Sequence, residues 1–341
     1  MAILTEAIDA LASRRDLSSE QAAAVLAEIM EGNASEVQTA AVLIALRTKG
    51  ETVDELVGLA TTMRRLARPV LTGRDDLIDT AGTGGGRPTF NVSTTAALIA
   101  AGAGCAVAKH GNRSATGLSG SADLLEALGV RIDLDPEAVA RCIEEAGFGF
   151  MFAPAHHGAT RFVVPVRKEL AVRTIFNFLG PLTNPAGAAR QVIGVSDAAF
   201  LETIAGALAK LGARKALVVS SADGLDEMST SGTTRVVEVD GPQLHSYEVS
   251  PEDVGLPRAR PEELAGGTPE DNAETTRRIF AGEPGPQRDL AVLNAGAAIY
   301  VAGRAETLEA GVREAEAAVD DGRAATSLDR LISMTRELAP V

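Results

Sequence analysis

The stretch LIDTAGTGGGRPTFNVSTTAALIAAG, residues 77–102, decides the fold. It opens with a short apolar run at 77–79, passes through a loop in which four of the five residues 82–86 are glycine, and ends in a helical stretch at 94–102. The same alternation recurs along the chain, with expected strands at 106–108, 130–132, 148–152, 192–195 and 216–219, and expected helices at 121–128, 136–146 and 198–211. Strands that alternate with helices predict an α/β domain with a mainly parallel central sheet covered by helices.

The first 68 residues show a different pattern, which predicts helices only. Apolar residues recur there at helical spacing, and three capping-box pairs mark helix starts at Ser18/Gln21, Ser35/Gln38 and Thr52/Glu55. The stretch 174–187, rich in Pro, Asn and Gly, is interpreted as a hinge that returns to this part. We therefore expect a small N-terminal helical domain of residues 1–70 plus about 172–187, hinged to a larger α/β domain of residues 71–171 and 188–341. Residues 251–271 are expected to form a loop, and the chain from 269 onward is expected to be helical.

Composition excludes several classes of protein. The 341 residues include 32 Lys and Arg against 46 Asp and Glu, a net charge of −14, so any polyanion must bind in a local cationic pocket. The absence of Trp and an aromatic content of 3% argue against base stacking. Two cysteines are too few for a disulfide framework or a zinc site. Residues 96–108, the longest near-apolar run, are too few to span a bilayer, and no signal peptide is evident, so we expect a cytoplasmic protein.

The glycine-rich loop is a candidate phosphate site. Glycines let the backbone approach a phosphate closely and turn its N–H groups inward. A helix expected to begin near Ser93 or Thr94 adds an N-terminus that favours anions, and Asn91 adds a side-chain donor. A tight turn with a Ser/Thr cap is the structural alternative, but the coincidence of loop, donors and helix start favours phosphate.

A second loop, KHGNRSATG at 109–117, follows the 106–108 strand and supplies two cations, a His, an Asn and two hydroxyls. An anionic ligand can use nearly all of these groups, so this is the most specific segment of the chain. Further along, His156 and His157 are adjacent and diverge on any regular element, which makes a metal site from the pair improbable. Arg167 and Lys168 suit a carboxylate clamp, although a solvated basic helix start explains them equally well.

The acidic loop after the 216–219 strand holds Asp223, Asp226 and Glu227. Mg²⁺ typically binds one or two carboxylates together with substrate phosphates. An acidic turn is the alternative in so acidic a chain, and the position at a strand end favours the metal. Together the four segments indicate a phosphorylated, pyrophosphorylated substrate beside a small acid.

These residues resemble the anthranilate phosphoribosyltransferase family over nearly the whole chain. The motifs are GTGG at 82–85 with TFNVST at 89–94, KHGNRS at 109–114, PVRKEL at 165–170, RTIFN at 173–177, LGPLTNP at 179–185 and GLDE at 224–227. The resemblance implies a fold similar to class III nucleoside phosphorylases and a homodimer formed through the helical domain. It also implies transfer of a phosphoribosyl group from phosphoribosyl pyrophosphate (PRPP) to the amine of anthranilate in tryptophan biosynthesis, with Mg²⁺ and release of pyrophosphate.

The resemblance also assigns binding residues. It implies PRPP on Gly82, Gly85, Gly86, Thr89, Asn91, Val92, Ser93, Thr94, Lys109, His110, Gly111, Asn112, Arg113, Ser114, Ala115, Thr116, Gly117 and Ser121. It implies anthranilate near Gly82, Asn112, His157 and Arg167, and Mg²⁺ on Ser93, Asp226 and Glu227. An aryl amine is neutral at pH 7, so no acid–base residue is expected, and Lys109 and Arg113 are expected to act electrostatically on the leaving group.

One position departs from the family pattern. The family usually has Asp where this chain has Gly86, and the loop to Asn91 is one residue shorter here. The carboxylate that would help to organise the PRPP and metal end of the site is therefore missing. We expect the positive charge of Arg87 to contact pyrophosphate instead. Two alternative functions remain: a pyrimidine nucleoside phosphorylase, which shares the GTGG-type loop, and a non-catalytic homologue that binds nucleic acid. The acidic charge and the intact KHGNR and Asp-Glu motifs oppose the second.

Overall fold

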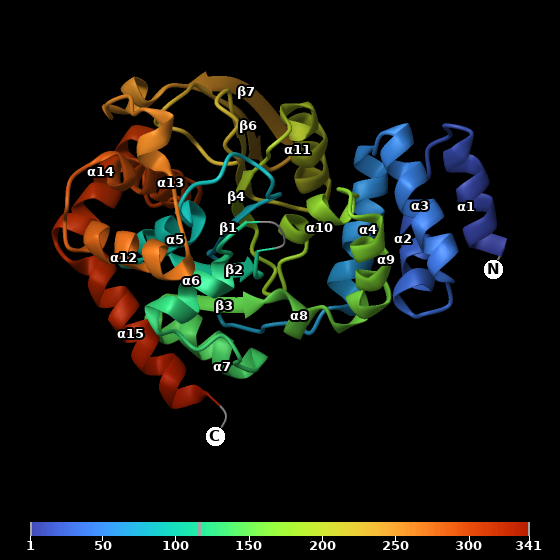
Figure 1. The fold of residues 1–341 in the computed structure, drawn as a ribbon, viewed down its shortest axis with the longest axis horizontal. Coiled ribbons are helices and arrows are strands. Elements are labelled where there is room, and N and C mark those ends of the chain that lie inside the picture. Colours follow the sequence, from blue (N-terminus) through green and yellow to red (C-terminus); the bar gives the residue numbers. More distant parts are fainter. Residues whose placement is uncertain (1, 115–116, 340–341) are drawn as a thin grey trace.

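The computed structural model describes residues 2–114 and 117–339, and they form two lobes, a bundle of N-terminal helices and a larger lobe built on a sheet (Figure 1). Within these described ranges, no helix combines the length and apolar character needed to cross a membrane.

The bundle begins with α1 (Ala2–Ala12), α2 (Ser19–Met30), α3 (Glu36–Lys49) and α4 (Val53–Leu66). All three predicted capping boxes are confirmed: Ser18, Ser35 and Thr52 each cap a helix reciprocally with the residue three positions later. Leucines on the inward faces are fully buried, among them Leu4, Leu26, Leu43, Leu46 and Leu56. The prediction of helices only in the first 68 residues is therefore confirmed.

Later segments of the chain complete this bundle. After α8 (Ala153–His156), the short η2 (Gly158–Phe162) packs on α2 and α9 (Val164–Leu170) packs on α3, while α10 (Phe176–Leu182) packs on α4. Val163 and Val166 belong to the same buried cluster as the bundle leucines. The predicted division assigned residues up to 171 to the α/β domain, but residues 158–170 pack with the bundle, because their apolar side chains find their partners there.

The larger lobe is built on one seven-stranded sheet in the order β3-β2-β1-β4-β5-β6-β7. Its strands are β1 (Leu77–Gly82), β2 (Ala106–Gly111), β3 (Phe148–Phe152), β4 (Arg190–Gly194), β5 (Lys215–Ser221), β6 (Thr234–Asp240) and β7 (Gln243–Val249). The first five strands of that order are parallel, with Thr80 opposite Val192, and β6 and β7 add an antiparallel hairpin at one edge. The predicted fold class, a helical domain joined to a mainly parallel α/β domain, is confirmed.

Successive side chains of the central strands enter two separate cores, as expected for strands covered on both faces. Leu217 and Val219 of β5 face the core that contains α5 and α13, whereas Ala216 and Val218 face the core that contains α11 and the bundle. The helices and short turns of this lobe are α5 (Val92–Gly102), α6 (Ser121–Leu128), α7 (Pro136–Arg141), η1 (Cys142–Ala146), η3 (Ala198–Phe200), α11 (Leu201–Lys210), η4 (Pro251–Val254), η5 (Pro261–Leu264), α12 (Pro269–Phe280), α13 (Pro286–Val301), α14 (Leu308–Asp320) and α15 (Arg323–Leu338).

Two features of the sheet differ from the prediction. The apolar run 130–132 is not a strand: Val130 and Ile132 are buried, and the N–H group of Arg131 donates to Thr335 Oγ1 on α15 (3.2 Å) rather than to a strand. The β6–β7 hairpin was not predicted. Its outer strand β7 is largely exposed and carries few apolar residues, whereas β6 is mostly buried and its valines were a signal that was missed. Both cysteines, Cys105 and Cys142, are buried and free.

Candidate functional site

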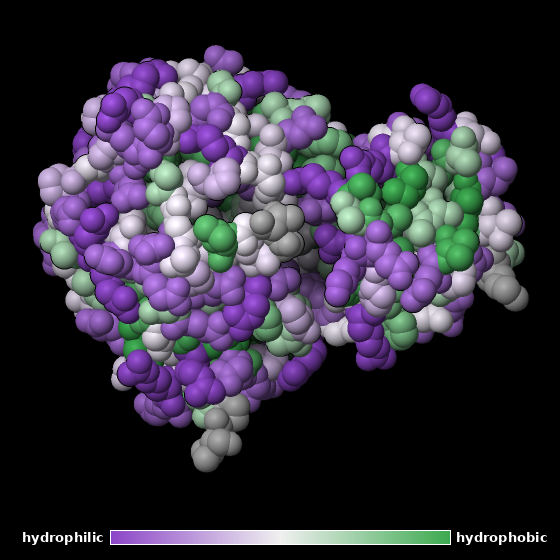
Figure 2. All heavy atoms as spheres, in the orientation of Figure 1, coloured by the Kyte–Doolittle hydropathy of each residue, from purple (hydrophilic) through white to green (hydrophobic). Residues whose placement is uncertain are grey.

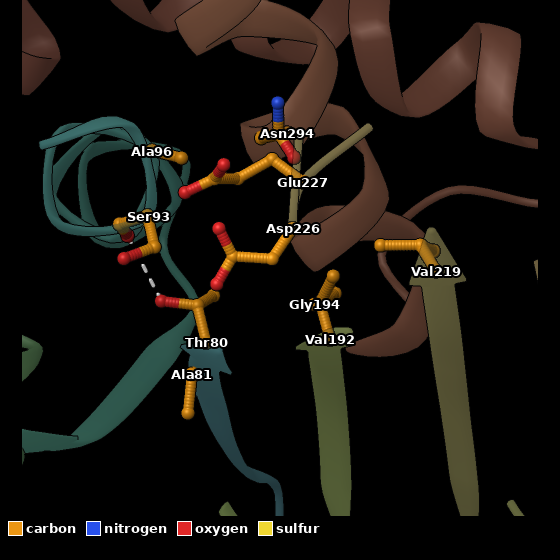
Figure 3. A pocket seen from close by; sticks show the side chains of 10 residues that line it. All are labelled: Thr80, Ala81, Ser93, Ala96, Val192, Gly194, Val219, Asp226, Glu227 and Asn294. Atoms are coloured by element: carbon orange, nitrogen blue, oxygen red, sulfur yellow. Dashed lines mark hydrogen bonds between the residues drawn. The ribbon is translucent and has the colours of Figure 1, made fainter. Parts of the chain in front are cut away.

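The carboxyl ends of β1, β4 and β5 meet the N-terminus of α5 around one small pocket (Figure 3). In an open parallel sheet, this edge is where ligands bind. The residues that line the pocket are Thr80, Ala81, Ser93, Ala96, Val192, Gly194, Val219, Asp226, Glu227 and Asn294. The structure therefore brings together the three side chains expected to hold Mg²⁺, although Ser93 lies more than 130 positions before Asp226 and Glu227 in the sequence.

The glycine loop curls over this pocket through left-handed backbone at Gly84 (φ +65°) and Gly85 (φ +83°), which glycine adopts without strain. The N–H group of Gly84 donates to Asp226 Oδ2 (2.9 Å), which ties the loop to the acidic loop. The N–H groups of Gly85 and Gly86 donate to no other described residue. They remain available to an anion, whereas in the first turn of α5 the N–H groups of Val92, Thr94 and Thr95 already donate to the carbonyls of Phe90 and Asn91.

Gly86 and Arg87 have roles that the sequence did not predict. A Cβ atom on Gly86 would lie 2.5 Å from Asp226 Oδ1 and 2.8 Å from the Asp226 nitrogen, so this loop is shaped for glycine. Arg87 does not stand free for pyrophosphate: its Nη2 pairs with Asp223 Oδ2 (3.1 Å) and its Nη1 donates to the carbonyl of Pro261 (2.7 Å). The expectation that Arg87 contacts pyrophosphate is therefore not supported, because its charge is already engaged by the acidic loop.

Lys109 lies at the floor of the site with its side chain 1% exposed. Its Nζ donates to the carbonyl of Thr80 (2.5 Å) and lies 3.5 Å from Ser93 Oγ, and burial lowers its pKa to about 8. The carboxylate of Asp79, also buried, accepts from the His110 N–H group (3.2 Å) and from Asn184 Nδ2 (2.7 Å). This buried network fixes the carboxyl ends of β1 and β2 relative to each other.

The rest of the cationic loop is organised by α6. Arg113 pairs with Asp123 (2.7 Å) and Glu126 (2.5 Å), so its charge is engaged on α6 rather than directed at the pocket. Asp123 also accepts from the N–H groups of Ser114 (3.2 Å) and Gly120 (2.8 Å). Gly117 donates to Ser114 Oγ (2.7 Å), and the proposed contacts of Ala115 and Thr116 lie outside the described residues.

Asn91 and its neighbours mark the start of α5. Asn91 Oδ1 accepts from Ser119 Oγ (2.8 Å) and from Asn272 Nδ2 (2.9 Å). This side chain therefore links the glycine loop and the loop after β2 to α12, and it does not cap its own helix. Within α5, Val92 and Thr94 are buried. Thr89 is partly exposed on the same loop, and Ser121 Oγ lies beside Gly111 across the cationic loop.

Two of the residues predicted to bind anthranilate lie at segments that pack on the bundle: His157 directly precedes η2, which packs on α2, and Arg167 is on α9, which packs on α3. The rings of His110 and His157 are in contact, with centroids 5.0 Å apart and their planes tilted by 54°. Burial lowers their pKa values to about 3 and about 4, so both rings are neutral at pH 7. Neither ring nitrogen of His157 has a partner among the described residues. Arg167 on α9 lies 5.5 Å from the centre of the Phe176 ring, and burial lowers its pKa.

The acidic pair fits a divalent cation that also binds substrate phosphate. Burial raises the pKa of Asp226, and burial together with repulsion from Asp226 raises the pKa of Glu227 well above its usual value. Figure 3 shows the Glu227 carboxylate directed toward Ser93 and that of Asp226 toward Thr80. Over the described part of the chain, no group of three or more His, Cys, Asp or Glu side chains is arranged to hold a metal. A Mg²⁺ ion bound by one or two carboxylates usually takes its remaining oxygens from substrate phosphates and water.

Asn294 on α13 is a site residue that sequence reasoning missed. Its Oδ1 accepts from the Met228 N–H group (3.0 Å) and its Nδ2 donates to the Met228 carbonyl (2.9 Å), which fixes the backbone directly after Glu227. The available signal was a buried polar residue within the apolar helix sequence LAVLNAGAAIY. A contact of Arg173 with the glycine loop was also missed.

Known proteins share both the sequence and the architecture of this chain. A glycosyl transferase family a/b domain matches residues 74–325, and a glycosyl transferase family helical bundle domain matches residues 5–67. The chain is 53% identical to the anthranilate phosphoribosyltransferase of Rubrobacter xylanophilus, over 99% of both chains, and 48% identical to that of Moorella thermoacetica, over 99% of this chain and 100% of the relative.

Solved structures with the same fold include anthranilate phosphoribosyltransferases. Anthranilate phosphoribosyltransferase from Thermus thermophilus superposes with a TM-score of 0.92 at 47% identity, covering 97% of this chain and 99% of that one. The enzyme from Saccharomyces cerevisiae in complex with PRPP and Mg superposes with a TM-score of 0.90 at 26% identity, covering 99% of both chains.

Proposed function

Because the chain belongs to the anthranilate phosphoribosyltransferase family, we propose that the pocket at the carboxyl edge of its sheet holds PRPP and Mg²⁺ beside an anthranilate site on the bundle side. The reaction joins the amine of anthranilate to C1 of the ribose and releases pyrophosphate, a step of tryptophan biosynthesis. Relatives about half identical over nearly the full chain carry this assignment. Neither the nucleoside phosphorylase nor the nucleic-acid-binding alternative gains support.

The glycine loop and the start of α5 are proposed to bind the PRPP phosphates. The free N–H groups of Gly85 and Gly86 provide donors, and the positive end of the α5 dipole favours an anion, without a charged side chain. Lys109 provides a buried positive charge below them. Arg113 contributes to pyrophosphate only if it exchanges its partners on α6, since its guanidinium is paired there.

Asp226, Glu227 and Ser93 are proposed to hold Mg²⁺ with the phosphate oxygens. Two carboxylates beside a polyanionic leaving group would repel it unless a cation lies between them. When bound, the ion neutralises charge that develops on the departing pyrophosphate. The single observation that carries this assignment is that all three side chains line one pocket at the N-terminus of α5.

Anthranilate is proposed to bind near Gly82, Asn112, His157 and Arg167. Arg167 is suited to hold the carboxylate, and the two neutral histidine rings can face an aromatic acid without adding charge. The aryl amine is already a free base at pH 7, so no general base is required. Positioning this amine behind C1 and excluding water then account for much of the rate.

The chain is also proposed to act as a cytoplasmic homodimer. Figure 2 shows apolar side chains gathered on the surface of the bundle. Ile3 on α1 (45% exposed) and Val37 on α3 (79% exposed) are among the exposed large apolar residues of the described chain, and Ile44 on α3 is 37% exposed. An apolar face of this kind marks an interaction site. Val37→Asp should shift the protein to monomers in sedimentation, whereas a monomeric wild type would remove the proposal.

The direct test follows the loss of anthranilate fluorescence with PRPP and Mg²⁺, with and without a chelator. The chain has no Trp, so the protein background is low. Arg167→Ala should raise the KM for anthranilate roughly thirtyfold, as expected for loss of a charged hydrogen bond of about 2 kcal/mol, with the KM for PRPP unchanged. Arg161→Ala, which removes an exposed arginine from the preceding turn, is the control. An unchanged anthranilate KM in a folded Arg167→Ala variant would exclude Arg167 from the site.

A further inference from the structure

Arg173 connects the hinge to the glycine loop. It lies between α9 and α10, yet its Nη1 donates to the carbonyl of Gly84 (2.5 Å) and its Nη2 to the carbonyl of Thr83 (3.2 Å). Ser196, which follows β4, donates its Oγ to the same Gly84 carbonyl (3.0 Å). Two consecutive carbonyls of the glycine loop are therefore held by side chains from outside the loop.

The main chain of Arg173 is fixed from the other lobe. Arg47, in the last turn of α3, donates from Nη1 to the Arg173 carbonyl (2.8 Å). The next residue, Thr174, donates its N–H group to Asn177 Oδ1 (3.0 Å) at the start of α10. A continuous chain of hydrogen bonds thus runs from the bundle through Arg173 to the glycine loop.

These contacts decide which backbone groups of the loop remain free. With the carbonyls of Thr83 and Gly84 occupied by Arg173, and the Gly84 N–H group held by Asp226, the N–H groups of Gly85 and Gly86 are left to an anion. A Cβ atom on Gly85 would overlap the Arg173 guanidinium, so the loop is built around this side chain. A loop this rich in glycine has little conformational preference of its own.

We infer that Arg173 is a positioning residue: it holds the glycine loop in its anion-binding conformation and makes that conformation depend on the attachment of the hinge to the bundle. The inference rests on the proposed function, because the bound anion is the PRPP of that proposal. Its two donors are occupied by carbonyls, so its effect reaches the substrate through the loop and not through contact.

Kinetics of four single variants test this inference, with wild-type turnover as the separate test of the proposed function. Arg173→Ala should raise the KM for PRPP about tenfold, and Arg47→Ala and Ser196→Ala should each raise it about threefold. The KM for anthranilate should stay within twofold in all of them. Arg173→Lys should resemble Arg173→Ala, because an ammonium group cannot replace a planar fork that serves two carbonyls. Arg161→Ala is the control for removal of an exposed cation near the hinge.

The double variant Arg47→Ala/Arg173→Ala distinguishes one chain of contacts from two separate effects. If both residues act through one chain, the double variant should be no worse than Arg173→Ala alone. The inference is overturned if Arg47→Ala and Ser196→Ala match wild type while Arg173→Lys restores activity, since Arg173 would then act by direct charge on the substrate. It is also overturned if Arg173→Ala leaves the KM for PRPP unchanged, or if only the KM for anthranilate rises.

Discussion

Replacing Asn294 by Ala should damage both stability and the response to Mg²⁺. The substitution leaves the N–H group and the carbonyl of Met228 without their partners inside the protein. Leu290, whose carbonyl also accepts from Asn294 Nδ2 (2.9 Å), keeps its ordinary helical partner within α13. Two backbone groups left without partners, at ~1–3 kcal/mol each, lower the free energy of unfolding by about 2–6 kcal/mol.

At ~2–4 °C per kcal/mol, that loss corresponds to a fall in Tm of roughly 4–24 °C. The Mg²⁺ concentration at half-maximal activity should also rise about tenfold, since partners that orient metal ligands have effects of that size. The reason is that Asn294 fixes the backbone directly after Glu227. Thermal unfolding and Mg²⁺ titration of the fluorescence assay measure the two effects.

Ile299→Ala is the matched control. Ile299 is buried on the same helix, more than one turn further along, and its truncation costs ~2–5 kcal/mol without touching the acidic loop. Its Tm should fall by a similar amount while the Mg²⁺ response stays unchanged. If Asn294→Ala shows the same Mg²⁺ response as this control, Asn294 is only a structural residue and the reasoning is refuted.

The remaining predictions concern the charges of the site. Asp226→Asn with Glu227→Gln should lower turnover by ~10²-fold or more, as loss of about 3 kcal/mol of charge stabilisation implies. Burial raises the pKa of both carboxyl groups in the folded protein. The folded protein is therefore most stable at low pH, where both groups are protonated, and its free energy of unfolding falls as the pH rises through the raised pKa values. The metal-free double variant should therefore melt above wild type at pH 7, and the difference should vanish in a pH titration of Tm below about pH 4. Gly86→Asp should raise the KM for PRPP, because its Cβ displaces Asp226, and an improved KM would contradict the loop geometry. Since the pKa values of His110 and His157 lie at about 3 and about 4, the anthranilate KM should be flat between pH 5.5 and 8 on the ordinary His scale, whereas an inflection near pH 6.5 would show that a histidine titrates in the site.

Local sequence signals predicted local structure well. The capping boxes of the bundle and the strand, glycine loop and helix of residues 77–102 depend on neighbours within a few positions. The convergence of the glycine loop and the acidic pair was also predictable in outline, because the carboxyl ends of parallel strands share one edge of the sheet. The sequence thus identified the glycine loop, the start of α5 and the acidic loop of the pocket, but not Asn294 on α13.

Contacts between distant segments were not predictable in the same way. Asn294 and Met228 are 66 positions apart, and Arg173 and Gly84 are 89 apart. Arg87 was expected at a phosphate and pairs with Asp223, 136 positions away. Nothing in the local sequence states which side chain a loop will meet, since that depends on strand order and on the way the bundle folds back onto the sheet.

The prediction of a strand at residues 130–132 was wrong for a related reason. Burial alone does not distinguish a strand from a segment covered by a helix, and here α15, about 200 positions later, supplies the partner. The exposed strand β7 shows the opposite error, a strand that was not predicted. A strand at the edge of a sheet carries few of the apolar residues by which strands are recognised.

The two cores on either side of the sheet have a consequence for how the molecule comes apart. A single apolar cluster contains the bundle leucines, α10, α11 and one face of β4 and β5. Helix α4 packs against α11 and keeps solvent away from it. The cooperative units of unfolding should then be divided by the plane of the sheet and not by the hinge peptides. In native-state hydrogen exchange, α11 should open together with α4, although the two helices lie in different sequence domains. An α/β domain expressed without the first 70 residues would expose the apolar face of α11, and it should aggregate rather than behave as an independent folding unit.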